Sequence, residues 1–410
     1  MSISGSAEPS PMMLPATLRK ITETLAGELA RPTEHAPDWS DFEWVMARAV
    51  AVLHGVSPLL SRTLRWQGPP DWAAFLDEQR AHTALRHVRI RELLRRIDLR
   101  AREEGVGAVA LKGAALHAMG LYAAGERPMA DIDLLVRPAD AERAARMLES
   151  LGFYESCVSW KERVFTPVDE HAPNSLGEHS DNSIKIELHE RICERLPWHI
   201  TDVTEHVFPS QAYPGLNAYP SRASLMIHLL LHAAGSMAFQ SLRLLHLHDL
   251  AQLSSLMTDA DWDEVLAHGS SGRRLWWALP PLRLTSRYYS SRVPARVLAA
   301  LGNVCPFLLE RVSGHKSLYD VSYSYLWVDA LPGAEWSQSF REFLGFAVSR
   351  VRPSADHVAM REQTAKTQAW AVQSQWAHLS QGRRVARWIT SRPTRPATMH
   401  AVRAALARTQ

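Results

Sequence analysis

The sequence predicts an α+β protein in which a small mixed sheet lies between two helical regions. Short apolar runs with the length and alternation of strands are confined to residues 106–189, whereas apolar residues have helical spacing before and after this part of the chain. The 410-residue chain is 46% hydrophobic and 22% charged, values that are ordinary for a soluble globular protein with a large core. Neither a miniprotein nor a mainly disordered chain fits this composition.

The N-terminal quarter is expected to be helical after a flexible arm. Residues 1–38 are rich in Pro, Ala, Ser and Thr, which predicts a flexible arm with one short helix around residues 18–29. Residues 39–105 form the predicted N-terminal helical region, and its long last helix begins near Pro70. One face of that helix is apolar, with Ile90, Leu93, Leu94 and Ile97 at i, i+3, i+4 and i+7.

Residues 106–215 are expected to form the α+β core. Here the apolar period changes from helical to strand-like and back, and glycines end several of the elements. The expected strands cover 106–111, 130–136, 153–168 and 183–189, the expected helices cover 114–122 and 138–152, and a polar loop covers 169–181.

Residues 216–410 are expected to form a C-terminal helical domain with a basic tail. Helices are predicted over 225–234, 242–256 and 262–268. Trp336, Phe340 and Phe343 recur at helical spacing, which predicts that they pack in a core.

The charge of the tail admits two interpretations. After Glu362 the chain carries eight basic and no acidic residues, although its total net charge is only +3. Such a tail suits an acidic partner, namely nucleic acid, nucleotide or anionic membrane, but a solvated basic face is the more common reason for a run of charge. Nucleic acid is therefore the less favoured partner.

Localisation is expected to be cytoplasmic. The first twenty residues lack the basic and apolar regions of a secretion signal. The most apolar segment, residues 223–234, is too short for a membrane span and contains two histidines. The three cysteines are too far apart for a Cys-x-x-Cys pair, so a reducing compartment is expected.

Two acids on one predicted strand are the first candidate site. Asp131 and Asp133 lie two residues apart, so both carboxylates leave the same face of the strand. Two acids this close repel each other unless a cation lies between them, and hard oxygen ligands select Mg²⁺ or Mn²⁺. The same pattern at Asp261 and Asp263 has a simpler explanation, because it begins a helix, where acids serve as caps.

Two further features carry chemistry only in combination with these acids. Lys112 and Gly113 join a strand to a helix, which suits a phosphate, although a tight turn with a surface lysine has the same sequence. Between residues 184 and 189, Lys185, Glu187 and His189 alternate with apolar residues, which is also typical of a half-buried edge strand.

Residues 111–154, LKGAALHAMGLYAAGERPMADIDLLVRPADAERAARMLESLGFY, resemble the signature of the uncharacterised nucleotidyltransferase family of bacteria, within the polymerase-β-like superfamily. The resemblance extends over roughly residues 40–295, through the segments HGVSPLL, IELHERI, LRLLHLHDLAQL and DWDEVL. In that superfamily a Gly-Ser pair usually begins the helix, whereas Lys112 and Gly113 occupy its place here.

The resemblance implies a polymerase-β-like core at residues 106–215 and a role for each candidate. It implies that Asp131, Asp133 and Glu187 are the catalytic acids and hold Mg²⁺ or Mn²⁺. Lys112 and Gly113 would hold the triphosphate. Of the remaining two candidates, Arg127 would pair with the β or γ phosphate, and His189 would orient Glu187 or a water molecule. Should Glu187 not serve, Glu170 and Glu178 of the polar loop are the next acids.

The activity implied is transfer of a nucleoside monophosphate from a nucleoside triphosphate to a hydroxyl or phosphate of a small-molecule or peptide acceptor. Members of the resembled family often occur near clusters that tailor ribosomally made peptides such as lasso peptides, which favours a natural-product acceptor. One alternative is a glycosyltransferase that binds a nucleotide sugar through Asp131 and Asp133. Another is a non-catalytic scaffold that binds nucleic acid through the basic tail.

A second metal site is the weaker interpretation of the histidines on the predicted C-terminal helices. His228 and His232 lie at i, i+4, and His246 and His248 precede Asp249, but no H-E-x-x-H motif is present. Buried or surface histidines with ordinary hydrogen-bond partners are therefore expected. The P-loop, Rossmann and nucleophile-elbow motifs are also absent from the sequence.

Overall fold

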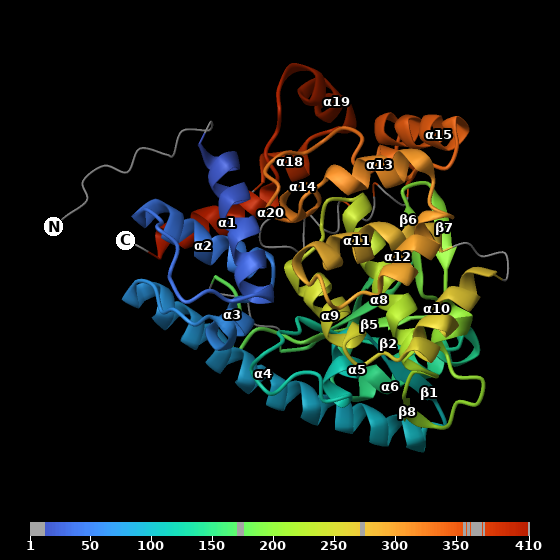
Figure 1. Cartoon of the computed structure of the whole chain (residues 1–410). Coiled ribbons are helices and arrows are strands. Elements are labelled where there is room, and N and C mark those ends of the chain that lie inside the picture. Colours follow the sequence, from blue (N-terminus) through green and yellow to red (C-terminus); the bar gives the residue numbers. More distant parts are fainter. Residues whose placement is uncertain are drawn as a thin grey trace.

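The structure, a computed structural model, confirms an α+β protein with a mixed six-stranded sheet. It describes residues 13–169, 176–270, 275–355 and 374–408, together with residues 358, 361 and 371. Figure 1 shows N-terminal helices on one side of the molecule, the sheet in its lower part, and the C-terminal helices above and beside it.

The N-terminal region consists of four helices: α1 (Leu14–Ala30), α2 (Asp41–Leu53), α3 (Ser57–Thr63) and α4 (Pro70–Glu103). Helix α1 is longer than the short helix expected in the arm, because Leu18, Ile21 and Leu25 form an apolar stripe that is completely buried. Helix α4 runs along the lower edge of the molecule in Figure 1.

The centre of the sheet is formed by the strands that carry the candidate acids. The first strand, β1 (Gly107–Ala110), leads into helix α5 (Lys112–Ala118), and β2 (Asp131–Val136) pairs antiparallel with β1. Strand β5 (Lys185–His189) lies on the other side of β2 and runs parallel to it, while β8 (Gly215–Asn217) runs parallel to β1.

The predicted strand over residues 153–168 is wrong in one respect, because it is a hairpin of two strands. Strands β3 (Phe153–Val158) and β4 (Arg163–Pro167) pair antiparallel, and β4 also pairs antiparallel with β5. The Ser159 amide donates to the Glu162 carbonyl at 2.8 Å, which closes a polar turn that interrupts the apolar alternation. The predicted helix after Pro138 is present as α6 (Ala141–Ser150).

A second, two-stranded sheet was not predicted. It consists of β6 (Cys193–Leu196) and β7 (His199–Asp202), and a short helix, α7 (Thr204–Val207), follows it. Strand β6 contacts helix α8 (Arg222–Ala238), which is almost entirely buried.

The C-terminal part is helical, as expected. Helix α20 (Pro396–Ala407) contacts α2, so the end of the chain returns to the N-terminal helices (Figure 1). The helical elements that follow α8 are α9 (Leu244–Ser254), α10 (Asp259–Ser270), η2 (Trp276–Ala278), α11 (Leu279–Tyr288), α12 (Ala295–Gly302), α13 (Phe307–His315), α14 (Leu318–Val321), η3 (Ala334–Trp336), α15 (Phe340–Val351), α18 (Gln375–His378), α19 (Gln381–Thr390) and α20 (Pro396–Ala407).

The prediction that Trp336, Phe340 and Phe343 all pack in a core is wrong for Phe340. Trp336 is buried, but 73% of Phe340 is exposed, and its ring stacks on Phe343 at the surface. Helical spacing alone does not distinguish an inner stripe from an outer one, because both have the same period.

The two faces of the sheet pack against different cores. Ile132, Leu134 and Val136 of β2 belong to a core formed with α4 and α6, whereas Leu135 belongs to the larger helical core. Because side chains alternate along a strand, Asp131 and Asp133 share the face of Leu135. The hydrophobic pattern of β2 therefore directs both acids to the face opposite α4 and α6.

No single helix among the described residues is long and apolar enough to cross a membrane. Helices α2 and α3 meet the criteria of length and composition only as a pair, and the pair is bent by 113°.

Candidate active site

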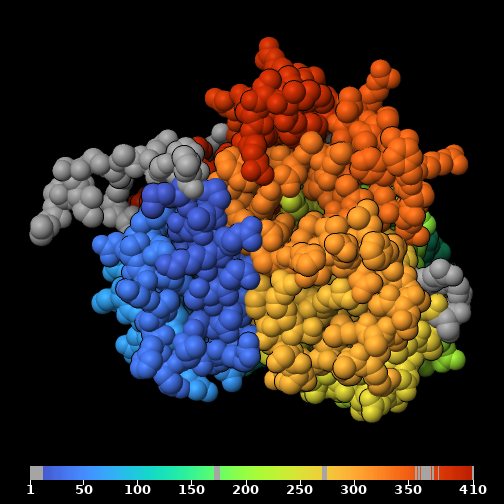
Figure 2. Space-filling model, turned by 45° about the horizontal axis from the view of Figure 1, so that its top comes forward, coloured from blue at the N-terminus to red at the C-terminus, as the bar shows by residue number. Residues whose placement is uncertain are grey.

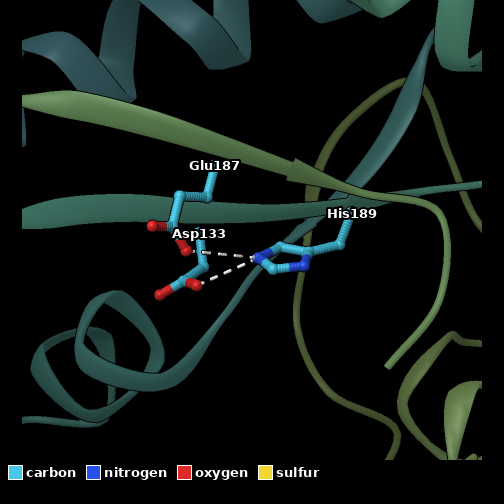
Figure 3. Close-up of side chains that lie close together, drawn as sticks. All are labelled: Asp133, Glu187 and His189. Carbon is cyan, nitrogen blue, oxygen red and sulfur yellow. Dashed lines mark hydrogen bonds and ion pairs between the residues drawn. The ribbon is translucent and has the colours of Figure 1, made fainter. Parts of the chain in front are cut away.

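The parallel pairing of β2 and β5 brings the predicted acids together. Asp131 lies opposite Lys185, and Asp133 lies opposite Glu187. His189 follows two residues after Glu187 and shares its face. Figure 3 shows the side chains of Asp133, Glu187 and His189 turned toward one another.

Asp133 is the best-satisfied acid of the group. Lys112 Nζ donates to its Oδ1 at 2.7 Å, and His189 Nε2 lies 3.0 Å from the same oxygen. Burial alone would raise the pKa of Asp133, but the Lys112 ammonium and the His189 hydrogen bond outweigh burial and hold that pKa well below its usual range. Asp133 is therefore ionised.

Asp131 is in the opposite situation. Within the described part of the chain, no residue donates a hydrogen bond to its carboxylate. Burial, and then the negative charge of Asp133, raise the pKa of Asp131. Helix α4 fixes the start of this strand, because Arg86 Nη2 donates to the Met129 carbonyl at 3.0 Å. Lys112 and Arg243 oppose this shift through their positive charges, but no described lysine or arginine forms an ion pair with Asp131.

Glu187 also lacks compensation. Burial and the charges of Asp131, Asp133 and Glu162 raise the pKa of Glu187 well above its usual range. Its nearest described ionic partner is His189, with Glu187 Oε2 3.8 Å from Nε2. Among the described lysines and arginines, only Lys112 forms an ion pair with one of these three acids, and Arg243 adds a positive charge without such a pair, so carboxylates outnumber cations at the site.

The donor set fits a divalent ion. One ligand atom each from Asp133, Glu187 and His189 lies within 4.8 Å of the other two. Carboxylate oxygens suit Mg²⁺ and Mn²⁺, and imidazole is also a ligand for transition metals. Asp131 extends the set by a carboxylate on the same face of β2.

Lys112 owes its position to an unusual backbone conformation. Its φ is +46°, in the left-handed region that a residue with a side chain rarely adopts. Its amide donates to the Tyr219 hydroxyl at 3.3 Å, and that hydroxyl lies 2.8 Å from His228 Nδ1. The strand-to-helix turn is therefore supported from α8 while the side chain of Lys112 reaches Asp133.

Gly113 leaves space for Arg127. A Cβ at residue 113 would lie 2.3 Å from Arg127 Nη1 and 2.6 Å from Met129 Sδ. The guanidinium of Arg127 forms a bidentate pair with Asp249, at 2.8 and 2.7 Å, and Tyr122 donates to the same carboxylate at 2.8 Å. Arg127, proposed from sequence as a phosphate ligand, is thus engaged with a buried acid of α9.

The remaining histidines have polar partners outside the acid cluster, and the rings of His232 and His246 are in contact. His232 Nδ1 lies 3.5 Å from Glu194, which also accepts from Lys161 at 2.6 Å. His248 Nδ1 lies 3.0 Å from the Tyr289 hydroxyl. Among the described residues, none of the histidines of α8 or α9 belongs to the acid cluster of Asp133.

Of the two alternatives to Glu187 in the polar loop, Glu178 lies within the described residues. Its Oε2 lies 3.1 Å from Arg86 Nε, so it is paired with α4. Glu170 lies outside the described residues.

Two charged residues near the acids were missed by the sequence analysis. Glu162, in the turn between β3 and β4, has Oε2 3.9 Å from His189 Nδ1. Arg243, just before α9, acts on the pKa of Asp131 through its positive charge, and no described acid forms an ion pair with it. No motif marks either residue, because both approach the site from distant parts of the chain.

One pocket of the described structure lies away from these acids. It has a volume of about 610 Å³ and lies beyond the C-terminal ends of β2 and β5, between Pro138, Glu190 and the second sheet. None of the candidate residues of the site lines it.

The sequence profile of one protein family matches residues 40–289, more than half of the chain, and this family is described as uncharacterised nucleotidyltransferase. The chain belongs to this family. The match includes β1, β2, β5 and all candidate acids, so the resemblance of the signature is confirmed. No curated protein and no solved structure matches the chain. Family membership indicates a transferase that uses a nucleoside triphosphate, with a divalent metal as the usual cofactor.

Proposed function

We propose that this nucleotidyltransferase family member transfers a nucleoside monophosphate to a hydroxyl or phosphate of a small-molecule or peptide acceptor, on a polymerase-β-like core. The observation that carries the proposal is the placement of Asp131, Asp133 and Glu187 on one face of two parallel strands. Their negative charges exceed the single ammonium that contacts them, and a buried excess of this kind favours a site for cations.

In this proposal the three acids bind the metal, and His189 has a separate task. Asp131, Asp133 and Glu187 hold Mg²⁺ or Mn²⁺, and His189 orients the Asp133 carboxylate. When bound, the metal supplies positive charge for the attacking and leaving oxygens of an in-line displacement. The acceptor oxygen forms a bond to the α-phosphorus, the bond from that phosphorus to the bridging oxygen breaks, and pyrophosphate leaves. A hydroxyl acceptor also gives up its proton to water in this step.

Lys112 and Arg243 are the proposed contacts for the triphosphate. Lys112 is next to Asp133, and Arg243 adds a positive charge near Asp131 without an ion pair to a described acid. Gly113 and Arg127 act indirectly, since the missing side chain of Gly113 admits the guanidinium that joins this turn to Asp249. A charge-assisted contact to a phosphate is worth about 1.5–3 kcal/mol before screening.

The acceptor is proposed to be a peptide or another natural product in a bacterial cytoplasm. The family has this context in the resemblance given above. The glycosyltransferase alternative needs no third carboxylate, so Glu187 separates the two reactions.

Mass spectrometry of candidate acceptors is the experiment that names the reaction. The protein is incubated with Mg²⁺ and each nucleoside triphosphate or nucleotide sugar, and the mass added to the acceptor is measured. We expect a nucleoside monophosphate and released pyrophosphate. A hexose on the acceptor would establish the glycosyltransferase instead.

Glu187→Gln is the matching variant. It keeps the side-chain size but removes a proposed metal ligand, so we expect kcat to fall by about 100-fold or more with nearly unchanged affinity for the triphosphate. Glu190→Gln is the control, because Glu190 lines the separate pocket and should retain full activity. Full activity of Glu187→Gln would remove Glu187 from the site.

A further inference from the structure

Helix α15 presents an apolar stripe to solvent. Phe340, Leu344, Val348 and Val351 are 73%, 46%, 59% and 53% exposed, respectively. Their spacing of four, four and three residues places them on one side of the helix. The other side of the helix packs against the protein. Phe346 is buried there, and a Cβ added at Gly345 would lie 3.2 Å from the Trp198 ring. The stripe is therefore separate from the packing side of α15.

Helix α19 extends this surface. Gln381 Nε2 donates to the Arg350 carbonyl at 2.6 Å, and the Arg350 guanidinium lies 4.9 Å from the centre of the Trp388 ring. These contacts fix α19 beside α15. Next to this contact, Ile389 is 81% exposed. Figures 1 and 2 show both helices projecting at the top of the molecule, in orange and red.

Arginines border the apolar side chains. Arg341 and Arg352 are exposed at the two ends of α15, and Arg383 and Arg387 are exposed on α19. No acidic residue in the described ranges forms an ion pair with any of the four. Arg408 of the tail, by contrast, pairs with Glu78. We define the amphipathic face as the nine exposed residues named for α15 and α19, the apolar ones and the arginines.

We propose that the amphipathic face binds the surface of an anionic lipid bilayer. A projecting helix with aliphatic and aromatic side chains on one side and arginines beside them can insert the former among acyl chains and pair the latter with lipid phosphates. Nucleic acid offers phosphates but no apolar layer for Leu344, Val348 and Val351. The face lies outside residues 40–289, so this inference is independent of the proposed transfer reaction.

Sedimentation of the full-length protein with vesicles tests the proposal. The probes are vesicles of phosphatidylcholine alone and of phosphatidylcholine with about one-third phosphatidylglycerol. We expect binding to the anionic vesicles that weakens with added salt, and little binding to the neutral ones. The affinity of the double variant Leu344→Asp, Val348→Asp for anionic vesicles should be lower by about tenfold or more, because the variant places two charges where acyl chains would lie.

A charge variant and a control complete the test. Arg341→Gln with Arg352→Gln removes charge without touching the stripe and should weaken binding to anionic vesicles by about fivefold for each arginine. Val88→Glu changes a side chain that is 62% exposed on α4, at the other side of the molecule, and should bind as the parent does (Figure 1).

Three results would overturn the proposal. The first is a parent protein that sediments with neither kind of vesicle, and the second is binding of both face variants at the level of the parent. The third is a dimer of the parent in light scattering that the Leu344→Asp, Val348→Asp variant dissociates, because the face would then join two copies of the chain.

Discussion

Two groups of buried charges lie close together in this protein and are built in opposite ways. Around Arg127, charge is matched, since one guanidinium meets one carboxylate, Asp249, in two hydrogen bonds, and both side chains are less than one-tenth exposed. Around Asp131 the charge is unmatched, since among the described lysines and arginines only Lys112 forms an ion pair with one of the three acids, and Arg243 adds a positive charge without such a pair. Breaking a matched buried pair destabilises a fold, whereas an unmatched buried excess itself costs stability, and we infer that it is retained for a ligand. The difference separates structural from functional charge without reference to any motif.

The largest loss of stability is expected when the pair of Arg127 and Asp249 is broken. Asp249→Asn leaves the Arg127 guanidinium buried without its carboxylate, which we expect to lower the free energy of unfolding by about 3–5 kcal/mol. Chemical denaturation followed by circular dichroism measures the loss. Asp263→Asn is the control, because its pair with Arg296 is exposed and such pairs contribute about 1 kcal/mol or less. Equal effects of the two variants would contradict the assignment of Arg127 to a structural pair.

A smaller loss of stability is expected when Glu194, which pairs with Lys161 and His232, is replaced. Burial opposes ionisation, but Lys161 and His232 together lower the pKa of Glu194 to about 2. A lowered pKa stabilises the folded state above the ordinary carboxyl range, and this contribution disappears as the pH falls through that range toward about 2. Glu194→Gln should therefore cost about 1–3 kcal/mol at neutral pH and little in acid. Unfolding measured across pH tests this, and a loss that is independent of pH would contradict it.

The sequence predicted the unmatched group better than the matched one. The two-residue period of a strand places Asp131 and Asp133 on one face, so a correct strand prediction was enough for these two acids. Glu187 was assigned to the site from the resemblance to the family, and the parallel register of β2 and β5 brings it opposite Asp133. Arg127 and Asp249 are 122 residues apart, and only tertiary packing brings them together. Local pattern carries no information about such a partner.

The same limit explains the other differences. The hairpin at residues 159–162 depends on a polar turn within an otherwise apolar run, and the burial of α1 depends on helices that pack against it. The exposure of Phe340 depends on which side of α15 meets the second sheet. In each case the element or its period was visible in the sequence, but its neighbour was not.

The structure also separates Asp131 from Asp133, which the sequence treats alike. Asp133→Asn removes the charge that Lys112 contacts, so this variant should be less stable than the parent. Asp131→Asn removes a carboxylate that has no described hydrogen-bond donor and a raised pKa, so it should leave the metal-free protein as stable as the parent or more stable. The two substitutions are chemically identical and are therefore each other's control.

Thermal unfolding of these two variants and the parent, with and without Mn²⁺ at neutral pH, tests the central claim that the acid excess is kept for a cation. We predict that Mn²⁺ raises the Tm of the parent, that Asp131→Asn unfolds at or above the Tm of the metal-free parent, and that both variants lose most of the response to Mn²⁺. An Asp131→Asn variant that is destabilised, or that responds to Mn²⁺ as the parent does, would contradict the claim.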